Sequence, residues 1–284
     1  MNTDGKSENE QAAIWNGVSG CAWIDLQELL DQVLRPFEDL LVESVVAASA
    51  SSVLDVGCGT GGTTLAVARS LAATSHCTGI DISQPMIALA RARAEKERLR
   101  PGFIVDDAQS HVFEPASFDM IISRFGVMFF DDTVRAFANL RSAARTDARL
   151  LLIVWRGAAD NPFMTTAERA AASLLPNVPP RQPDGPGQFA LADQSRVRDI
   201  LMKSGWTGIE IKPIDVVCTF PEQQLVAYFT RLGPLGRILE PVEDKTRRHV
   251  IATVRAAFDP YVHGDEVRFV AACWSVSARA PQAR

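Results

Sequence analysis

A glycine-dense turn that directly follows an aliphatic strand constrains this chain more than any other feature. Residues 53–62 read VLDVGCGTGG, and the pattern after them predicts a helix. Glycine is needed where a backbone turns tightly, adopts a positive φ or lets a ligand lie on it without a Cβ in the way. The first turn of the helix presents N–H groups that no helical carbonyl accepts. The turn therefore predicts a ligand site between strand and helix.

The residue two positions before the first glycine narrows the class of ligand. Gly57, Gly59 and Gly62 satisfy the G-x-G-x-x-G spacing of dinucleotide-binding proteins, so a nicotinamide-dependent oxidoreductase is one alternative. Asp55 disfavours it, because a carboxylate repels a pyrophosphate and attracts an ammonium group. S-adenosylmethionine carries an amine and no phosphate, so Asp55 favours that cofactor.

Short aliphatic runs alternate with helical stretches along the chain. This alternation predicts an α/β fold with a doubly wound, mostly parallel sheet. The expected strands are 52–56, 77–80, 103–105, 118–123, 149–155, 208–220 and 266–278. The expected helices are 26–48, 62–72, 84–97, 132–144, 164–175 and 193–204, followed by a mostly helical stretch 221–260. Pro36 is expected to bend or split the first helix, and the proline- and glycine-rich segment 176–188 is expected to be a surface loop.

Acidic residues follow the second and third strands, at the edge where the glycine turn lies. Asp81 ends the second strand, where a carboxylate can accept hydrogen bonds from both hydroxyls of a ribose. Asp107 follows the third strand and is expected to accept from an adenine amine, with the neighbouring backbone at Ala108 beside it. Ile82 and Met86 are expected to enclose the purine.

The segments VLDVGCGTGG, GIDIS, DDAQ and FDMIISRFGVMFF, in that order, resemble the class I S-adenosylmethionine-dependent methyltransferases. The resemblance is to the broad group that includes ubiquinone and menaquinone biosynthesis enzymes, and it covers residues 51–155. It implies a Rossmann-like, seven-stranded sheet with one antiparallel strand, for which 266–278 is the candidate. One departure is Thr146-Asp-Ala, where the family commonly has a proline-glycine-glycine turn; it affects a turn and not the site.

The resemblance also implies a division of labour among the site residues. The methionine end of the cofactor is expected at Asp55, Gly57 and Gly59, the ribose at Asp81 and the adenine at Asp107. Ser123, at the end of the fourth strand, is expected to face the side of methyl transfer.

The chain divides into three expected parts. Residues 1–50 form an N-terminal lid and helix, 51–156 the cofactor-binding core, and 157–284 the completion of the sheet. The insertions 157–192 and 221–265 both leave the carboxyl ends of strands, where ligands of open α/β sheets bind, so they are expected to fold into a helical substrate cap.

Aromatic residues surround the expected mouth of the site. Trp15 and Trp23 lie in a glycine-punctuated stretch and are expected to belong to the lid, with plain core packing as the alternative. Phe125 and Phe129 add apolar material, which favours a small hydrophobic or aromatic acceptor.

Methyl transfer requires chiefly that the acceptor be aligned with the sulfonium carbon. Where a base is needed, His111 is the candidate by position, and Arg124 is a second candidate catalytic residue. Each has a structural alternative, which for Arg124 is an ion pair.

Composition excludes several other classes of function. A net charge of -5 and a sequence pI of 5.5 argue against nucleic acid as the partner. No apolar run approaches the roughly 18 to 20 residues that span a bilayer, and the polar start MNTDGKSENEQ lacks a secretory signal, so the protein is expected to be cytoplasmic. Five cysteines and four histidines are dispersed, which predicts neither disulfides nor a metal site.

Two classes of function are favoured over the oxidoreductase: a methyltransferase, and a non-catalytic partner protein that only binds S-adenosylmethionine. A partner protein is expected to have lost part of the glycine turn or the acid at position 81, and both are present. The sequence leaves open the acceptor atom, the identity of the acceptor and the oligomeric state.

Overall fold

One mixed sheet organises the molecule. The computed structural model describes residues 4–72, 74–175, 185–239 and 241–281. Its strands are β1 (Ser52–Val56), β2 (His76–Asp81), β3 (Gly102–Val105), β4 (Phe118–Arg124), β5 (Ala144–Trp155), β6 (Thr207–Pro221), β7 (Val262–His263) and β8 (Glu266–Arg279).

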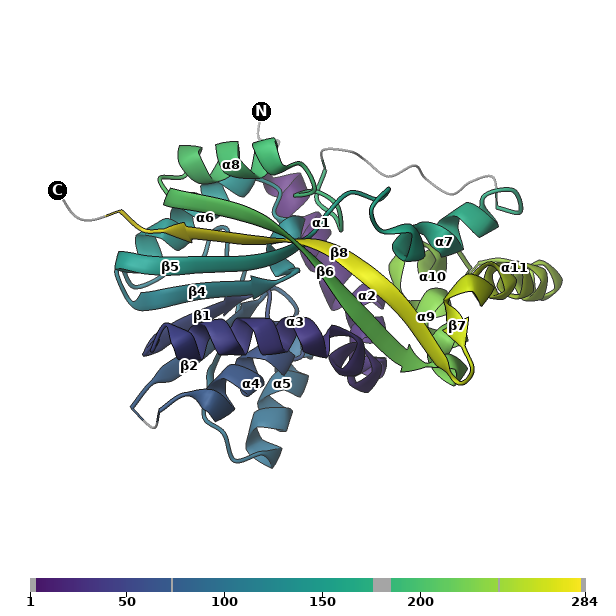
Figure 1. The fold of residues 1–284 in the computed structure, drawn as a ribbon, viewed down its shortest axis with the longest axis horizontal. Coiled ribbons are helices and arrows are strands. Elements are labelled where there is room, and N and C mark those ends of the chain that lie inside the picture. Colours follow the sequence, from purple (N-terminus) through teal and green to yellow (C-terminus); the bar gives the residue numbers. More distant parts are fainter. Residues whose placement is uncertain (1–3, 73, 176–184, 240, 282–284) are drawn as a thin grey trace.

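The order of the strands is β3-β2-β1-β4-β5-β8-β6, and the short β7 pairs with β8 (Figure 1). Strands β1 to β5 pair in parallel, whereas β8 is antiparallel to both of its neighbours. The predicted seven-stranded, mostly parallel sheet is therefore confirmed, and 266–279 is its antiparallel strand. The strand β7 is an addition that the sequence pattern did not indicate.

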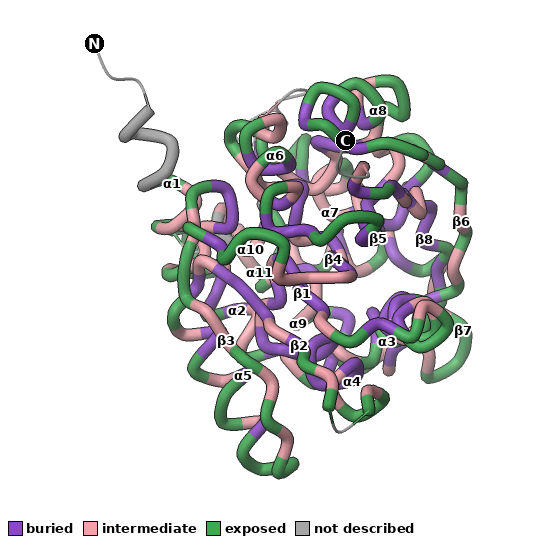
Figure 2. Tube along the Cα trace, turned by 90° about the vertical axis from the view of Figure 1, so that its left-hand side faces the viewer, coloured by how far each residue is buried: buried purple, intermediate pink, exposed green. Residues whose placement is uncertain are grey.

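Helices cover both faces of this sheet. In Figure 1, α6 and α8 lie on one face, and α3, α4 and α5 lie on the other. The buried residues gather in the central strands, and the outer turns of α5 are largely exposed (Figure 2). The helices are α1 (Asp4–Asn16), α2 (Val18–Asp25), α3 (Gln27–Ala47), α4 (Gly62–Ser70), α5 (Gln84–Lys96), α6 (Thr133–Ala143), α7 (Pro162–Ala171), α8 (Gln194–Lys203), α9 (Leu225–Arg231), α10 (Gly233–Leu239) and α11 (Asp244–Ala257), with short turns η1 (Gly126–Phe129), η2 (Glu222–Gln224) and η3 (Asp259–Tyr261).

The helix α3 runs unbroken through Pro36, so the expected split does not occur. Proline removes one backbone hydrogen bond from a helix and crowds the preceding turn. Here Val33 and Phe37 on either side of the proline are at most 1% exposed, as are Leu41 and Val45 further along the same face. Packing on both sides of Pro36 holds the helix together, because tertiary contacts supply most of the stability of helices in proteins.

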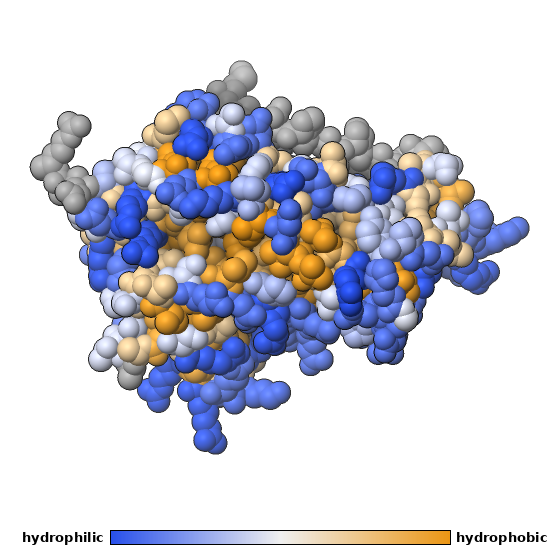
Figure 3. Space-filling view, in the orientation of Figure 1, coloured by the Kyte–Doolittle hydropathy of each residue, from blue (hydrophilic) through white to orange (hydrophobic). Residues whose placement is uncertain are grey.

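Two strands extend well beyond the rest of the sheet and carry a second layer of structure. The strands β6 and β8 are 15 and 14 residues long, against five for β1, and they stay paired from Glu210 to Pro221. Their extension supports α7, α9, α10 and α11 (Figure 1). On the face shown in Figure 3, hydrophobic residues are exposed over β6 and β8 in the middle of the molecule. The described parts of the two insertions thus form helices on this extension. Residues 176–184 of the proline-rich segment lie outside the described residues.

None of the helices in the described part of the chain combines the length and the apolar character needed to cross a membrane.

A buried asparagine fastens the cap helix α7 to the sheet. The side chain of Asn161 accepts a hydrogen bond from the Ala272 amide at 2.9 Å and donates one to the Ala272 carbonyl at 2.9 Å. Asn161 is 1% exposed, and its partner Ala272 lies 111 positions further along the chain. The amide side chain therefore acts like a neighbouring strand to β8 and fixes the start of α7.

Replacing this asparagine tests how firmly the cap is attached. Asn161→Ala leaves the buried amide of Ala272 without a partner, whereas the Ala272 carbonyl still accepts from the Arg156 amide at 3.0 Å. We therefore expect the free energy of unfolding to fall by about 1–3 kcal/mol, measured by urea denaturation. Thr165→Ala in the same helix removes an exposed hydroxyl that bonds within its own turn, and it should stay within about 0.5 kcal/mol of wild type. Equal effects of the two changes would contradict the anchoring role.

Candidate functional site

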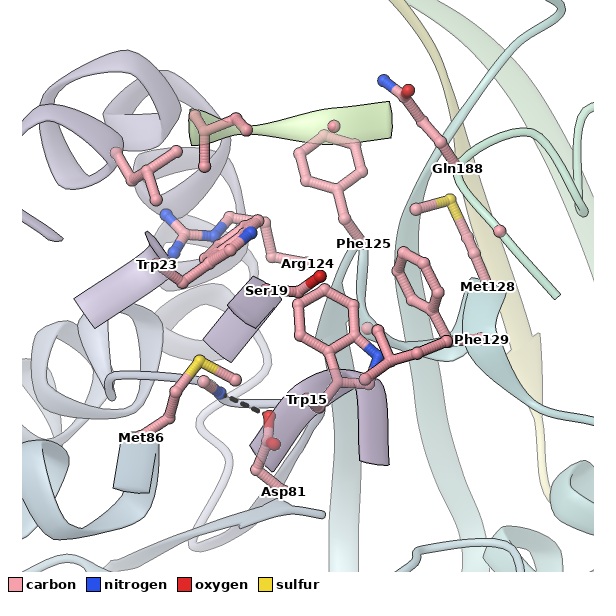
Figure 4. Close-up of a pocket in the computed structure, with 18 of the residues that line it drawn as sticks. Trp15, Ser19, Trp23, Asp81, Met86, Arg124, Phe125, Met128, Phe129 and Gln188 are labelled. Carbon is pink, nitrogen blue, oxygen red and sulfur yellow. Dashed lines mark hydrogen bonds between the residues drawn. The ribbon is translucent and has the colours of Figure 1, made fainter. Parts of the chain in front are cut away.

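A deep cavity opens at the carboxyl ends of β1, β2 and β4 (Figure 4). Its volume is about 460 Å³, which suits a small ligand of the kind that fills enzyme pockets. All three expected parts of the chain line it: α1 and α2, the loops of the core, and α7, α9 and α10 of the cap. The cavity therefore lies where the order of the strands predicts a ligand in an open α/β sheet.

The glycine turn forms the floor of the cavity. Gly57 and Gly59 adopt φ values of +68° and +54°, the left-handed region that favours glycine. A Cβ at Gly57 would lie 2.5 Å from the Cα of Gly126, so the two backbones pack directly on each other. A Cβ at Gly59 would meet nothing closer than the Met86 sulfur at 3.9 Å. Gly59 therefore presents bare backbone to the cavity.

Asp81 ties the glycine turn to the loop after β2. One carboxylate oxygen accepts from the Gly59 amide at 2.8 Å, which Figure 4 shows as a dashed line, and the other accepts from the Ser83 amide at 2.8 Å. The residue is 9% exposed and lines the cavity. Burial raises its pKa, and the backbone amides that it accepts from oppose that rise. Its remaining lone pairs are available to hydroxyl donors of a ligand.

Asp55 lies deeper at the same edge. It is 1% exposed, lines the cavity and accepts a hydrogen bond from the Thr64 hydroxyl at 2.6 Å. Burial raises the pKa of Asp55 to about 6, against the opposing hydrogen bond from Thr64 and the charge of Arg124. A cation placed in the cavity would stabilise the ionised form.

A cluster of charged side chains borders the cavity beside the start of α4, and sequence reasoning missed most of it. Asp31 pairs with Arg93 at 2.5 Å, and Glu38 lies 3.7 Å from Arg124. A Cβ on Gly62, the first residue of α4, would lie 2.9 Å from the Asp31 carboxylate. The available signal was the spacing of Asp31 and Glu38, because acids seven residues apart share one face of a helix and here interrupt an apolar face.

The two N-terminal helices close one side of the cavity. Trp15 lies edge-on to Phe129, with ring centroids 4.9 Å apart, and 6.1 Å from Trp23. The Ser83 hydroxyl donates to the Trp15 carbonyl at 2.6 Å, so this segment is attached to the loop that Asp81 orders. Asn16 adds two contacts to the same loop: it donates to the Ile82 carbonyl at 3.2 Å and accepts from the Gln84 amide at 2.9 Å.

The structure brings most of the predicted site residues together. The cavity is lined by Trp15, Trp23, Asp55, Gly57, Gly59, Asp81, Ile82, Met86, Asp107, Ala108, Arg124, Phe125 and Phe129.

Two predicted site residues do not line the cavity. Ser123 is fully buried, where its hydroxyl donates to the Val56 carbonyl at 2.7 Å and accepts from the Gly126 amide at 3.2 Å. It thus supports the glycine turn from behind. The His111 ring nitrogen lies 2.7 Å from the Asp106 carboxylate, and the ring packs edge-on to Phe113 at 4.6 Å.

The polar groups of the cavity indicate the ligand chemistry that fits it. The buried oxygens of Thr63 and Gln11 have no hydrogen-bond partner within the protein, and both residues line the cavity. Carboxylates outnumber cations along the wall, which suits a ligand with an ammonium group and hydroxyls and disfavours a pyrophosphate. Within the described ranges, no cluster of three or more histidine, cysteine or acidic side chains could hold a metal ion.

Comparison with known proteins identifies the core segment. Residues 53–147 match the family model described as a methyltransferase domain. The aklanonic acid methyltransferase DauC of Streptomyces sp. (strain C5) is 34% identical over 109 residues, which cover 38% of this chain and 50% of that protein. A demethylmenaquinone methyltransferase of Lactiplantibacillus plantarum is 31% identical over 108 residues, which cover 37% of this chain and 46% of that protein. The chain thus spans about half of the length of each relative.

A solved structure shows that the similarity of fold extends further along the chain. Phosphoethanolamine N-methyltransferase 2 of Haemonchus contortus, in complex with S-adenosyl-L-methionine, matches with a TM-score of 0.50 at 20% identity, over 85% of this chain and 52% of that chain. At this identity the match establishes the fold. Residues 53–147 thus match a methyltransferase domain, and the resemblance drawn from the sequence motifs is confirmed.

The raised pKa of the buried Asp55 carboxylate predicts how the stability of the ligand-free protein depends on pH. Because the pKa is raised from 3.8 to about 6 in the folded state, the stability from this group is full below 3.8 and is lost as pH rises through about 6. Asp55→Asn should therefore stabilise the ligand-free protein by about 1–3 kcal/mol at pH 7.5, with a smaller gain at pH 4.5, measured by urea denaturation at both pH values.

Asp132→Asn is a matched control, because Asp132 caps α6 at its N-terminus and asparagine caps equally well. It should change stability by no more than about 0.5 kcal/mol at either pH. A variant Asp55→Asn that is less stable than wild type at pH 7.5 would show that the carboxylate stabilises the fold.

Proposed function

Starting from the methyltransferase domain at residues 53–147, we propose that this chain transfers the methyl group of S-adenosylmethionine to a small, hydrophobic or aromatic acceptor. The observation that carries the proposal is the Asp81 carboxylate, which accepts from the Gly59 and Ser83 amides and faces the cavity. The same cavity continues from this carboxylate into an aromatic region formed by the cap.

Three groups of residues are proposed to hold the cofactor. Asp81 accepts from the ribose hydroxyls. Arg124, which lines the cavity beside the glycine turn, suits the carboxylate of the methionine end. Asp55 with Gly57 and Gly59 is proposed to bind its ammonium side, and Ile82, Met86, Asp107 and Ala108 to surround the adenine. The bound cofactor supplies a methyl group on a sulfonium sulfur.

The remaining task of the chain is to exclude water and to orient the acceptor. Trp15, Trp23 and Phe129 form an aromatic wall of edge-on contacts along one side of the cavity. Attached through Asn16 and Trp15 to the loop after β2, this wall is proposed to act as a lid over the bound cofactor. Alignment of the acceptor in a closed cavity can supply about 7–11 kcal/mol of the lowering of the barrier.

The cap provides the wall against which the acceptor binds. We call the part of the cavity lined by Phe163, Met164, Tyr228, Phe229, Leu235 and Phe258 the acceptor chamber. The chamber is continuous with the cofactor site through Phe125 and Trp155, which stack with centroids 4.6 Å apart. Its apolar surface supports a hydrophobic or aromatic acceptor, because burial of apolar area contributes about 25 cal/mol per Å².

A catalytic role for His111 and Arg124 stays a prediction. His111 does not line the cavity. Arg124 lines it 3.7 Å from the Glu38 carboxylate, but a guanidinium donates hydrogen bonds and accepts none, so neither side chain offers a base beside the acceptor chamber. An acceptor that is already nucleophilic would need alignment alone.

The alternatives weighed from the sequence remain less supported. A nicotinamide cofactor would place its pyrophosphate among Asp55, Asp81 and Asp31. A non-catalytic binding protein would have no need of an open acceptor chamber beside the cofactor site. A cytoplasmic location, a small-molecule partner in place of a nucleic acid, and the division into lid, core and cap are parts of the same proposal.

Replacing Asp81 tests the cofactor site. Asp81→Ala removes the acceptor for the ribose hydroxyls, so we expect S-adenosylhomocysteine to bind at least about tenfold more weakly and its stabilising thermal shift to shrink accordingly. The measurement is the melting temperature against S-adenosylhomocysteine concentration, with circular dichroism to show that the fold is retained.

Asp193→Ala is the matched control for that measurement. Asp193 also accepts from two backbone amides, those of Ser195 and Arg196, but it does not line the cavity. It should lower the melting temperature without changing the shift caused by S-adenosylhomocysteine. An unchanged shift in Asp81→Ala would contradict the proposed ribose contact.

The proposed lid can be tested through the rate at which S-adenosylhomocysteine dissociates. Asn16→Ala removes two contacts to the loop after β2 and one within α1, so the lid should open more often and S-adenosylhomocysteine should dissociate about fivefold faster. Stopped-flow displacement measures this rate. Ser142→Ala, which removes a hydroxyl that bonds locally to the Asn139 carbonyl, should leave the rate unchanged. Equal dissociation rates in wild type and Asn16→Ala would rule out a lid role for this contact.

A further inference from the structure

The acceptor chamber is apolar except for one phenol. Tyr228 lies on α9, and it is one of only two tyrosines in the chain. Other polar side chains that line the cavity near the cap already have partners: Arg231 pairs with Asp25, and Glu168 and Gln188 have contacts of their own. Among the residues that define the chamber, the Tyr228 hydroxyl is therefore the polar side-chain group that a ligand would meet.

Aromatic neighbours fix the ring of Tyr228. It stacks on Phe220 with centroids 5.2 Å apart and planes 27° apart, and it lies 5.7 Å from Phe163. Such contacts restrict the ring to one orientation. The direction of the hydroxyl is thus set by the fold before any ligand binds.

The hydroxyl has a poor partner in this orientation. It donates to the Met164 sulfur at 3.5 Å, and no oxygen or nitrogen among the described residues bonds to it. A thioether is a weak acceptor, whereas a hydroxyl and an oxygen acceptor meet at about 2.7–2.8 Å. Burial raises the pKa of Tyr228 well above its ordinary value, so the phenol keeps its proton at neutral pH and remains a donor.

We propose that Tyr228 selects acceptors that carry a carbonyl or hydroxyl oxygen on an apolar ring system, by donating its phenolic hydrogen bond to that oxygen. The inference rests on the proposed function, because it concerns the molecule that shares the cavity with the cofactor. A ligand oxygen replaces the Met164 sulfur as the acceptor, and the ring of the ligand fills the apolar walls. A site that offers a buried donor discriminates against analogues without the matching acceptor, since the donor is then left poorly paired.

A pair of probes that differ in one oxygen tests this selection. The probes are 1-tetralone and tetralin, two bicyclic molecules of similar size of which only the first has a carbonyl group. Their dissociation constants are measured by calorimetry on wild type and Tyr228→Phe, with and without saturating S-adenosylhomocysteine. The affinity ratio of tetralone to tetralin should fall about five- to tenfold in Tyr228→Phe, which corresponds to one hydrogen bond.

The second tyrosine provides a matched control. Tyr261 also packs on Phe163, at 5.0 Å, but it does not line the cavity. Tyr261→Phe should keep the wild-type ratio, and all three proteins should bind S-adenosylhomocysteine equally. The infrared carbonyl band of bound 1-tetralone should lie at lower wavenumber in wild type and in Tyr261→Phe than in Tyr228→Phe, which a purely structural effect on packing would not produce.

Three results would overturn the proposal: an unchanged ratio in Tyr228→Phe, an equal fall in Tyr261→Phe, or no binding of either probe to wild type. Failure of wild type to bind S-adenosylhomocysteine would contradict the proposed function instead. The two failures are distinguishable, because probe binding is also measured without that ligand.

Discussion

The carboxylate of Asp81 is the contact on which the site depends. By accepting from the Gly59 and Ser83 amides, it holds the glycine turn after β1 and the loop after β2 in one arrangement. The N-terminal segment is then attached to that loop through the Ser83 hydroxyl and Asn16. One buried acid thus aligns the floor of the cavity with the side that the N-terminal segment closes, and its burial cost is offset by two amide donors.

A second constraint joins the part of the cavity around the glycine turn to the acceptor chamber. The strand β8 pairs with β5 in the core and continues with β6 into the extension that carries the cap. Asn161 fastens α7 to the middle of that strand, at Ala272. The chamber is therefore built on the same sheet as the glycine turn, and Phe163 at the start of α7 stacks on Phe269 of β8 at 3.9 Å. This shared frame keeps the two halves of the cavity in a fixed relation.

Local pattern was sufficient for the sheet and for most of the residues that line the cavity. Aliphatic runs, glycine spacing and acids at strand ends are short-range signals, and they located Asp55, Asp81 and their neighbours on the cavity wall. Local pattern did not indicate the contacts between distant segments. Nothing near Ser123 indicated that its hydroxyl would turn to the Val56 carbonyl, and nothing near Asn161 indicated a partner 111 residues away. The continuity of α3 through Pro36 likewise depends on tertiary packing, which the rule that proline interrupts helices does not take into account.

Binding of S-adenosylmethionine, and not of a dinucleotide, distinguishes the proposed methyltransferase from an oxidoreductase. Calorimetric titration of the wild-type protein with S-adenosylhomocysteine, NAD and NADP tests this directly, because the three ligands share an adenosine and differ in the group that meets Asp55 and the glycine turn. From the proposed function we expect saturable, micromolar binding of S-adenosylhomocysteine and no measurable heat with NAD or NADP. Preference for either dinucleotide, or no binding of S-adenosylhomocysteine, would contradict it.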